Sequence, residues 1–384
     1  MRTNWSTRVT AGEYTLASSD MPSETIRGRC GMGPPPPARA AGAALPPGPP
    51  HHMDPRAAAG GPAVTAPLNR SCRNAATPGP PYRGGTVDRP AAAEGRPPMR
   101  FGVSSYTFAP ALEAGTLTVP DVVDLVADSD AAHLEISIAG LGSELVDDPE
   151  LVAAIRARAD ARGVVLANYA VGADLRGPDL DGEVARLHEH LRVAHELGIP
   201  LLRHDVFAWG WREADDAEFE RALATIVPVC RALADHAATL GIATTVENHG
   251  MSMNASDRIL RLVEAVDRPA FRVTLDVGNS LCVDEDPLDA VPRLLPHAAV
   301  VHLKDFDVRD VPPDDTWMTT LGGRGIRGAV VGSGDLPLRE LLGLVAASGF
   351  DGPVSIEFEG LEDPMTGFTQ GLAAAQRLAA EAVR

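Results

Sequence analysis

Lysine is almost missing from this chain of 384 residues, because Lys304 is the only one and the other 33 basic residues are arginines. Lys304 lies in the run VVHLKDFD (300–307). An ammonium is a compact, strongly hydrated point charge, whereas a guanidinium is a planar fork, so a built site does not accept the two equally. The composition therefore indicates a specific role for Lys304, against the simpler interpretation of a chance surface residue.

Cysteines and long apolar runs are also scarce. The four cysteines form no Cys-x-x-Cys pair and no other metal-binding spacing, so we expect free thiols in a reducing compartment. No segment approaches the roughly 20 apolar residues of a membrane span, and the N-terminus lacks the apolar core of a signal peptide. These absences predict a cytoplasmic protein with no membrane partner.

Basic residues are fewer than acidic ones, and this excess of negative charge is unevenly distributed along the chain. The chain has 34 Lys and Arg against 52 Asp and Glu, a net charge of -18. Residues 1–98 hold 11 Arg and 6 acidic residues, which leaves 23 basic and 46 acidic residues for the rest. So acidic a surface repels phosphate backbones. Nucleic acid is therefore not an expected partner, and a small-molecule substrate is.

Aliphatic residues are sparse in residues 1–98, which hold 18 of the 33 prolines. With so little to bury, the entropy cost of ordering is not offset. We expect a disordered Pro/Ala/Gly/Arg-rich extension over 1–98 and one folded domain over 99–384. Because MRFGVSSYTF begins at Met99 like a first strand, we hypothesise that Met99 is the functional start and that the upstream part is dispensable.

From Met99 onward, short apolar runs alternate with amphipathic stretches, several of which end at a glycine. This rhythm and length predict a (β/α)8 TIM barrel; a doubly wound sheet is the alternative, but it needs neither eight strands nor so many polar strand ends. The predicted strands are residues 100–105, 133–138, 164–169, 200–206, 242–248, 271–277, 298–304 and 353–358. The predicted helices include residues 149–161, 182–197, 217–240, 256–266 and 335–348, with stops at Gly163, Gly198, Gly241 and Gly349.

Polar side chains stand at the carboxyl end of six of the eight predicted strands, where the active sites of such barrels are built. They are Glu135, His204 and Asp205, Glu247 and His249, Asp276 and Asn279, His302 and Lys304, and Glu357 and Glu359. One charged residue at a strand end is an ordinary solvation feature. Six such ends predict a functional face.

Strand alternation narrows this set, because residues two apart share a face of a strand. If the inward face bears Glu247, Asp276, His302 and Glu357, four strands direct carboxylates and an imidazole toward one point. Such oxygen and nitrogen donors suit a divalent cation, with Mn2+ expected first and Mg2+, Co2+ or Zn2+ as alternatives. Because a buried unpaired carboxylate is costly, Glu247 and Glu357 need a metal or a salt-bridge partner.

The segments VENHG, LDVGN, VHLKD, VGSGDLPL and GFDGPVSIEFEG, in this order, resemble the xylose isomerase-like barrel superfamily of sugar phosphate isomerases and epimerases. The resemblance covers essentially residues 99–384. It implies that Glu247, Asp276, His302 and Glu357 are the metal ligands, and it implies a dimer or tetramer. Many relatives have His where this chain has Asn279, so we expect hydrogen bonding there rather than proton transfer.

Several other residues are candidates for contact with a substrate. Glu135 is expected to bind a substrate hydroxyl or to pair with an arginine such as Arg203. His204 and Asp205 cannot both face inward, His249 shares the side of Glu247, and the ring of Trp209 could wall a sugar pocket. The turn GSGD (332–335) resembles a phosphate cradle, but a glycine-rich turn capped by Asp335 is the better interpretation. The expected substrate-binding set is Glu135, His204, Trp209, His249 and Asn279.

These expectations lead to one leading function, metal-dependent proton transfer at a carbon next to a carbonyl in a sugar or polyol. Glu247 and Glu357 would be the acid and base, and Lys304 would donate to a substrate oxygen. A dehydratase acting on a keto-polyol or a dehydroshikimate-like substrate would use the same enediolate. A repair endonuclease is disfavoured by the acidic charge, and a non-catalytic sugar-binding barrel is the remaining alternative.

Overall fold

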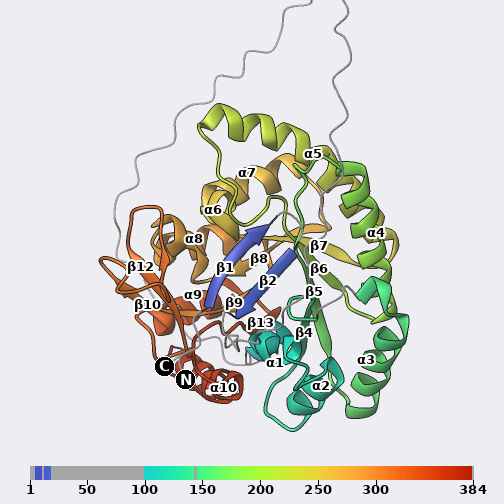
Figure 1. The fold of residues 1–384 in the computed structure, drawn as a ribbon, viewed down its shortest axis with the longest axis vertical. Helices are drawn as coiled ribbons and strands as arrows, with labels where there is room; N and C mark the ends of the chain where they lie inside the picture. The colour runs from blue at the N-terminus through green and yellow to red at the C-terminus, as the bar shows by residue number, and fades with distance from the viewer. Residues whose placement is uncertain (1–4, 11–12, 19–98, 142–144, 383–384) are drawn as a thin grey trace, which may run out of the picture. The chain divides into compact units, whose positions relative to one another are not determined.

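Eight parallel strands close into a barrel in the computed structural model, which describes residues 5–10, 13–18, 99–141 and 145–382. The strand order around the barrel is β13-β3-β4-β5-β6-β7-β8-β9 (Figure 1). Each predicted strand overlaps one of these, so the predicted TIM barrel is confirmed. The strands are β3 Arg100–Ser104, β4 Leu134–Ser137, β5 Leu166–Val171, β6 Leu201–His204, β7 Ala243–Glu247, β8 Phe271–Asp276, β9 Ala298–Leu303 and β13 Pro353–Ile356.

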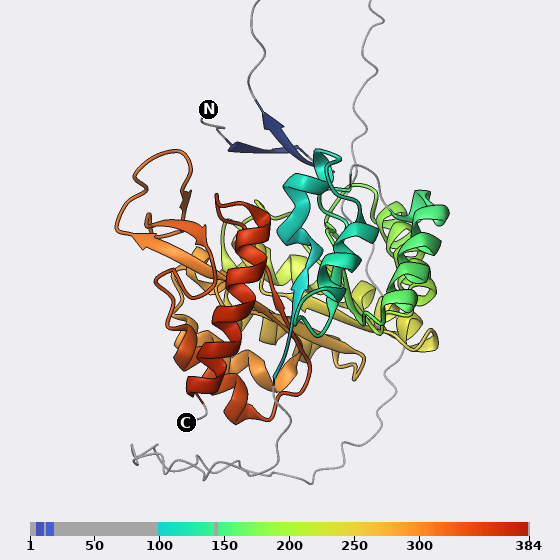
Figure 2. The same ribbon diagram turned by 90° about the horizontal axis from the view of Figure 1, so that it is seen from below.

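Helices surround the barrel, and α10 lies along its outer side against α9 (Figure 2). All five predicted helices are present, and α2, α8 and α10 add to them. The long helices are α2 Val119–Ala127, α3 Pro149–Arg162, α4 Leu180–Glu196, α5 Asp216–Thr239, α7 Ser256–Val266, α8 Pro287–Leu294, α9 Leu338–Ser348 and α10 Pro364–Ala382. Short turns of helix are η1 Ser105–Phe108, α1 Ala109–Glu113, η2 Leu145–Asp147, α6 Gly250–Met253, η3 Asn279–Val283 and η4 Leu295–His297.

The helix boundaries have local causes. Asp148, Asp179 and Asp215 cap α3, α4 and α5, each accepting a hydrogen bond from a backbone N–H in the first turn. The four glycines predicted as helix stops all have a left-handed backbone, with φ between 67° and 91°. A residue with a Cβ is strained there, which explains why the chain uses glycine to turn back toward the next strand.

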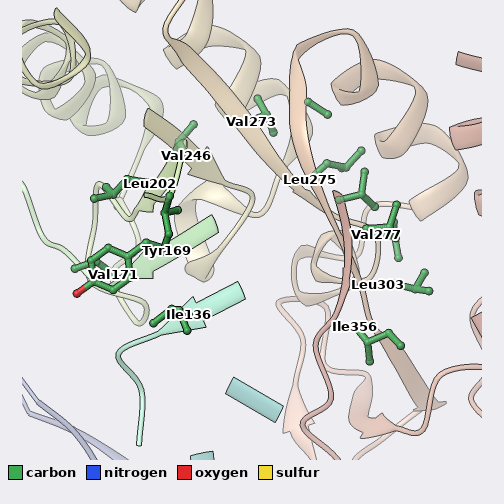
Figure 3. Close-up of a cluster of buried hydrophobic side chains, with 14 of the residues drawn as sticks. Ile136, Tyr169, Val171, Leu202, Val246, Val273, Leu275, Val277, Leu303 and Ile356 are labelled. Atoms are coloured by element: carbon green, nitrogen blue, oxygen red, sulfur yellow. The ribbon is translucent and has the colours of Figure 1, made fainter. Parts of the chain in front are cut away.

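Alternation along the strands separates an apolar outer layer from a polar interior. Side chains such as Leu202, Val246, Val273, Leu303 and Ile356 are fully buried between the strands and the helices (Figure 3). Burial of each such side chain stabilises the fold by about 1.5–3 kcal/mol. The residues between them point into the barrel, so the packing that holds the helices also aims every second side chain at the interior.

A three-stranded antiparallel sheet interrupts the connection from β9 to α9, and the sequence pattern did not predict it. Its strands are β10 Asp305–Arg309, β11 Met318–Thr319 and β12 Gly325–Ala329, in the order β10-β12-β11. Val308 and Ile326 pair across it. In β10, Phe306 and Val308 alternate with polar residues, but β11 has only two residues and Ile326 is the one large apolar side chain of β12, so no apolar pattern marks the sheet as a whole. The sheet continues the chain directly beyond Lys304.

The expected disorder of residues 1–98 lies outside the described residues, except for one strand pair. β1 Trp5–Thr10 and β2 Glu13–Ser18 are antiparallel, with Trp5 opposite Ser18. The prolines of this region begin only at Pro22, so the composition argument was weakest for these residues. The domain boundary at Met99 stays a prediction. In the described part of the chain, no helix has the length and apolar character needed to cross a membrane.

One buried histidine makes the stability of the barrel depend on pH. His133 is 3% exposed, and its Nε2 lies 3.0 Å from the Ser355 hydroxyl. Burial lowers the pKa of His133 to about 4. Its depressed pKa means that the unfolded chain binds the proton first as the pH falls from about 6.5 to about 4. The contribution of His133 therefore destabilises the folded state over that interval and not above it.

We expect His133→Gln to reduce this loss by about 3 kcal/mol, the linkage value for such a pKa difference. Urea unfolding of wild type and variant at pH 7.5 and pH 4 measures it, with the exposed His236→Gln as the control. Equal pH dependence in wild type and His133→Gln would show that His133 is not the group responsible.

Candidate metal centre

Four strands bring the predicted ligands together at the carboxyl end of the barrel. Glu247 ends β7, Asp276 ends β8, His302 is the penultimate residue of β9, and Glu357 directly follows β13. One ligand atom of each residue lies within 4.8 Å of those of the other three. The alternation of side chains along the strands therefore identified four residues whose side chains converge, although they lie up to 110 positions apart in the sequence.

Asp276 presents one oxygen to this cluster and commits the other to the backbone. Its Oδ1 accepts hydrogen bonds from the N–H groups of Gly278 (2.7 Å) and Asn279 (2.8 Å). The Asn248 side chain also bonds both backbone groups of Asp276, at 2.9 Å each. Oδ2 is buried and has no hydrogen-bond partner. The loop thus holds Asp276 with Oδ2, which accepts no hydrogen bond, directed at the other ligands and at Lys304.

His302 is held from one edge of its ring. Its Nε2 lies 2.9 Å from Glu135 Oε2, while its Nδ1 lies 3.4 Å from Glu247 Oε1 and 3.6 Å from Glu357 Oε2. Nδ1 is buried and has no hydrogen-bond partner. Buried polar atoms are normally satisfied. The unsatisfied Nδ1 and Asp276 Oδ2, set among carboxylate oxygens, fit the donor set of a divalent cation.

Glu247 is fixed by an arginine that the sequence analysis did not assign to it. Arg203 on β6 places Nε 2.8 Å from Glu247 Oε2 and Nη2 2.8 Å from Asp205 Oδ1. Burial alone would raise the pKa of Glu247, but the charges of Arg203 and His302 lower it to about 2. Glu247 is therefore ionised at neutral pH, with Oε1 facing the cluster.

Lys304 is surrounded by oxygens. Its Nζ lies 2.9 Å from Glu359 Oε1, 3.1 Å from Glu357 Oε2, 3.2 Å from Asn279 Oδ1 and 3.5 Å from Asp276 Oδ2. The side chain is only 5% exposed. Burial alone would lower the pKa of Lys304, but these carboxylates, led by Asp276, raise it well above its usual value. The chain's one lysine is thus a charged ammonium beside the metal ligands.

The carboxylates of the cluster differ in their affinity for protons. Burial alone would raise the pKa of Glu357, yet Lys304 and His302 hold it well below its usual value. Burial, together with the negative charges of Glu247 and Glu357, raises the pKa of Asp276 to about 6, although Lys304 opposes this rise. Glu247 and Glu357 therefore hold their protons less tightly than Asp276 does.

The predicted substrate-binding residues take different places. Asn279 joins the cluster, with its Nδ2 donating to Glu247 Oε1 at 3.2 Å. His249 Nδ1 lies 3.0 Å from Asp205 Oδ1, so it lies beside the cluster. Trp209 is half-buried in the loop after β6, where its carbonyl accepts from Met251 N. Glu135 contacts His302 rather than Arg203, the partner suggested for it from the sequence.

His204 is not brought to the cluster. Its neighbours Arg203 and Asp205 point inward, so His204 lies on the outer face of β6, buried with its ring 6.2 Å from that of Phe271. Burial lowers the pKa of His204. Only one of His204 and Asp205 could face inward, and the structure places Asp205 there.

Three residues of the site had no predicted contact with the ligands: Arg203, Asn168 and Asn248. Parity could have placed Arg203 inward, because it lies two residues before Asp205. Asn168 on β5 donates through Nδ2 to Glu135 Oε2 at 3.1 Å. Nothing in the local sequence indicates that contact, since it depends on how neighbouring strands align.

The glycine-rich turn at 332–335 does not cradle an external anion. The N–H groups of Gly332 and Gly334 both donate to Asp305 Oδ2, at 2.9 Å each. The chain therefore supplies its own carboxylate to the turn. Asp335 does not cap α9 as expected; its side chain accepts from Val308 N at 2.8 Å and so ties the turn to β10.

Comparisons with known proteins agree with this fold. The xylose isomerase-like TIM barrel family matches residues 123–378. A 2-epi-5-epi-valiolone 7-phosphate 2-epimerase of Actinoplanes sp. is 31% identical over 236 residues, which are 59% of this chain and 77% of that protein. The uncharacterized protein YihM of Escherichia coli is 28% identical over 123 residues, 32% of this chain and 34% of YihM.

The solved structures include a xylose isomerase-like TIM barrel protein of Mycobacterium smegmatis in complex with magnesium. Its TM-score with this chain is 0.56 at 17% identity, and the match covers 75% of this chain and 98% of that one. At such low identity the likeness concerns the fold. Together with the family match over residues 123–378, these findings show that the chain belongs to the xylose isomerase-like TIM barrel family.

Proposed function

We propose that this protein is a divalent-metal-dependent isomerase or epimerase of a sugar or a related cyclic polyol. The convergence of Glu247, Asp276, His302 and Glu357 at the carboxyl end of the barrel carries the proposal. The similarity to the 2-epi-5-epi-valiolone 7-phosphate 2-epimerase of Actinoplanes sp. supports it. The acidic balance of the chain supports a small-molecule substrate over a nucleic acid.

The proposed reaction moves a proton at the carbon next to a carbonyl group. A divalent cation held by the four ligands would supply Lewis acidity that stabilises negative charge on adjacent substrate oxygens. Glu247 and Glu357 reach the cluster from strands separated by β8 and β9. One of them, as the carboxylate, removes the proton from one face of the carbon, and the other, after taking up a proton from water, returns it from the opposite face.

Lys304 and Arg203 have separate tasks in this proposal. The Lys304 ammonium, 3.1 Å from Glu357, is placed to donate a hydrogen bond to the substrate oxygen on which negative charge develops. The pairing of Arg203 with Glu247 Oε2 keeps that carboxylate ionised and oriented. The base is therefore held in its active form before the substrate arrives.

Deuterium exchange tests the proposal directly. The protein, loaded with Mn2+, is incubated in D2O with ketohexoses such as D-fructose and D-psicose and with keto-inositols, and NMR locates any incorporated deuterium. We expect exchange at a carbon next to the carbonyl of at least one compound, together with an isomer or epimer. A conjugated, ultraviolet-absorbing product would instead identify a dehydratase. No exchange with any of these compounds or with their phosphate esters would contradict proton transfer.

Metal binding has its own expected result. A cation at 100 times its Kd stabilises the folded state by about 2.7 kcal/mol when it binds only that state. We expect this increase in the free energy of unfolding with Mn2+, its reversal by EDTA, and no such increase in Asp276→Asn at the same concentration. Parallel titrations with Mg2+, Co2+ and Zn2+ rank the metals. A wild-type protein that none of the four stabilises would lack the proposed site.

A further inference from the structure

Glu135 lies on the side of His302 that faces away from the other metal ligands. The imidazole is fully buried, with Nε2 2.9 Å from Glu135 Oε2 and Nδ1 toward Glu247 and Glu357. The ring therefore stands between Glu135 and the point where the four ligand atoms converge. A substrate bound at that point meets the ligands, and the His302 ring separates it from Glu135.

The contact with Glu135 decides which ring nitrogen carries the proton. A histidine must be a neutral imidazole to bind a metal, and with Glu135 Oε2 as the hydrogen-bond acceptor that imidazole places its N–H at Nε2. This leaves the lone pair on Nδ1, the atom that lies among carboxylate oxygens without a hydrogen-bond partner. The opposite tautomer would direct N–H at the cluster and remove its nitrogen ligand. Metal-binding histidines are commonly fixed in this way by a carboxylate on their other nitrogen.

Glu135 is itself held in place. It is fully buried on β4, and the Asn168 amide on the neighbouring strand donates to the same Oε2 at 3.1 Å. Glu135 and Asn168 are also paired in the register of β4 with β5. The oxygen facing His302 therefore has a fixed position set by the backbone of two strands rather than by a flexible loop.

We propose that Glu135 is a positioning residue for the metal site, which fixes the tautomer and orientation of His302, and that Asn168 holds Glu135 for this task. This inference rests on the metal site of the proposed function. It assigns Glu135 a role other than the substrate contact expected from the sequence. The role is exerted through His302 and needs no contact with substrate.

Mn2+ titration of the metal-free full-length protein tests the inference without any substrate. Glu135→Gln loses the charge, whereas Glu135→Asp keeps the charge but retracts the oxygen from His302 Nε2. We expect both variants to bind Mn2+ about 10–100-fold more weakly than wild type, the usual effect of removing such a partner. Asn168→Ala, which leaves Glu135 intact but unsupported, should bind more weakly as well. The matched control is Glu183→Gln, a partly buried carboxylate that pairs with Arg186 on α4, and its affinity should not change.

A second readout reports the tautomer itself. The measurement is a 15N NMR spectrum of the protein loaded with Zn2+, in which His302→Asn identifies the signals of His302. In wild type we expect the signal of a protonated Nε2. In Glu135→Asp we expect this Nε2 signal to be perturbed. If Glu135→Asp binds Mn2+ as wild type does and keeps the signal, Glu135 acts only through its charge and the inference fails. If wild type binds no Mn2+, the proposed metal site fails instead. Circular dichroism identifies unfolded variants, and if both Glu135 variants unfold, unchanged binding by Asn168→Ala overturns the inference.

Discussion

Glu247→Gln and Glu357→Gln each lower the rate of substrate deuterium exchange by about 10²–10⁴-fold, the usual contribution of a positioned acid or base. The amide keeps the size and one oxygen of the carboxylate but cannot accept the proton. Both residues are held ionised, Glu247 by Arg203 and Glu357 by Lys304, so each is able to act as a base at neutral pH. We expect neither variant to exchange at more than about 1% of the wild-type rate.

The measurement must separate proton transfer from metal binding, because both glutamates are also proposed ligands. Each variant is therefore assayed at a Mn2+ concentration shown by titration to saturate it. Glu362→Gln, an exposed carboxylate five residues beyond Glu357, is the control and should exchange as wild type does. Retained exchange by a metal-saturated variant would remove that glutamate from the acid or base role.

The ligands could be found from the sequence because two simple rules coincide in this chain. Active-site residues lie at the carboxyl ends of barrel strands, and residues two apart share a face. Glu247, Asp276, His302 and Glu357 satisfy both rules. The apolar residues between them, such as Leu275 and Leu303, are buried outside the barrel, which fixes the facing of the ligands. Packing thus makes the parity argument reliable for these strands.

Contacts across the barrel could not be found in this way. Glu135 and His302 lie on β4 and β9, which do not pair with each other, and parity says nothing about which inward side chains meet. Arg203 illustrates the same limit. Glu135 and Glu247 are both inward-facing carboxylates, and the sequence does not say which of the two Arg203 contacts. Register and closure of the whole barrel decide these pairs. Local sequence does not contain that information.

The glycine-rich turn shows a different limit of sequence reasoning. A run such as GSGD exposes backbone N–H groups that can bind an anion, but a phosphate and a carboxylate satisfy them equally well. Here the carboxylate of Asp305, the residue directly after Lys304, accepts hydrogen bonds from the backbone N–H groups of the turn. It faces opposite to Lys304, as strand alternation requires. One strand end therefore serves both the metal centre and the anchoring of the following sheet and turn.

Lys304→Met is expected to lower the turnover number by about 10²–10³-fold, the cost of removing one donor aimed at a developing oxyanion. Mn2+ binding should be kept or strengthened, because the change removes a positive charge 3.1–3.5 Å from two ligand oxygens. Turnover by the metal-saturated variant and a Mn2+ titration measure the two effects. A loss of activity that merely followed a loss of metal would assign Lys304 a structural role.

Lys304→Arg distinguishes a placed donor from a required charge. Arginine keeps the positive charge, but its planar fork cannot take the place of an ammonium that lies within 3.5 Å of oxygens from Asp276, Asn279, Glu357 and Glu359. We therefore expect Lys304→Arg to be nearly as inactive as Lys304→Met at saturating Mn2+. Turnover close to wild type would mean that any cation suffices. The single lysine among 33 arginines would then carry no information about the chemistry.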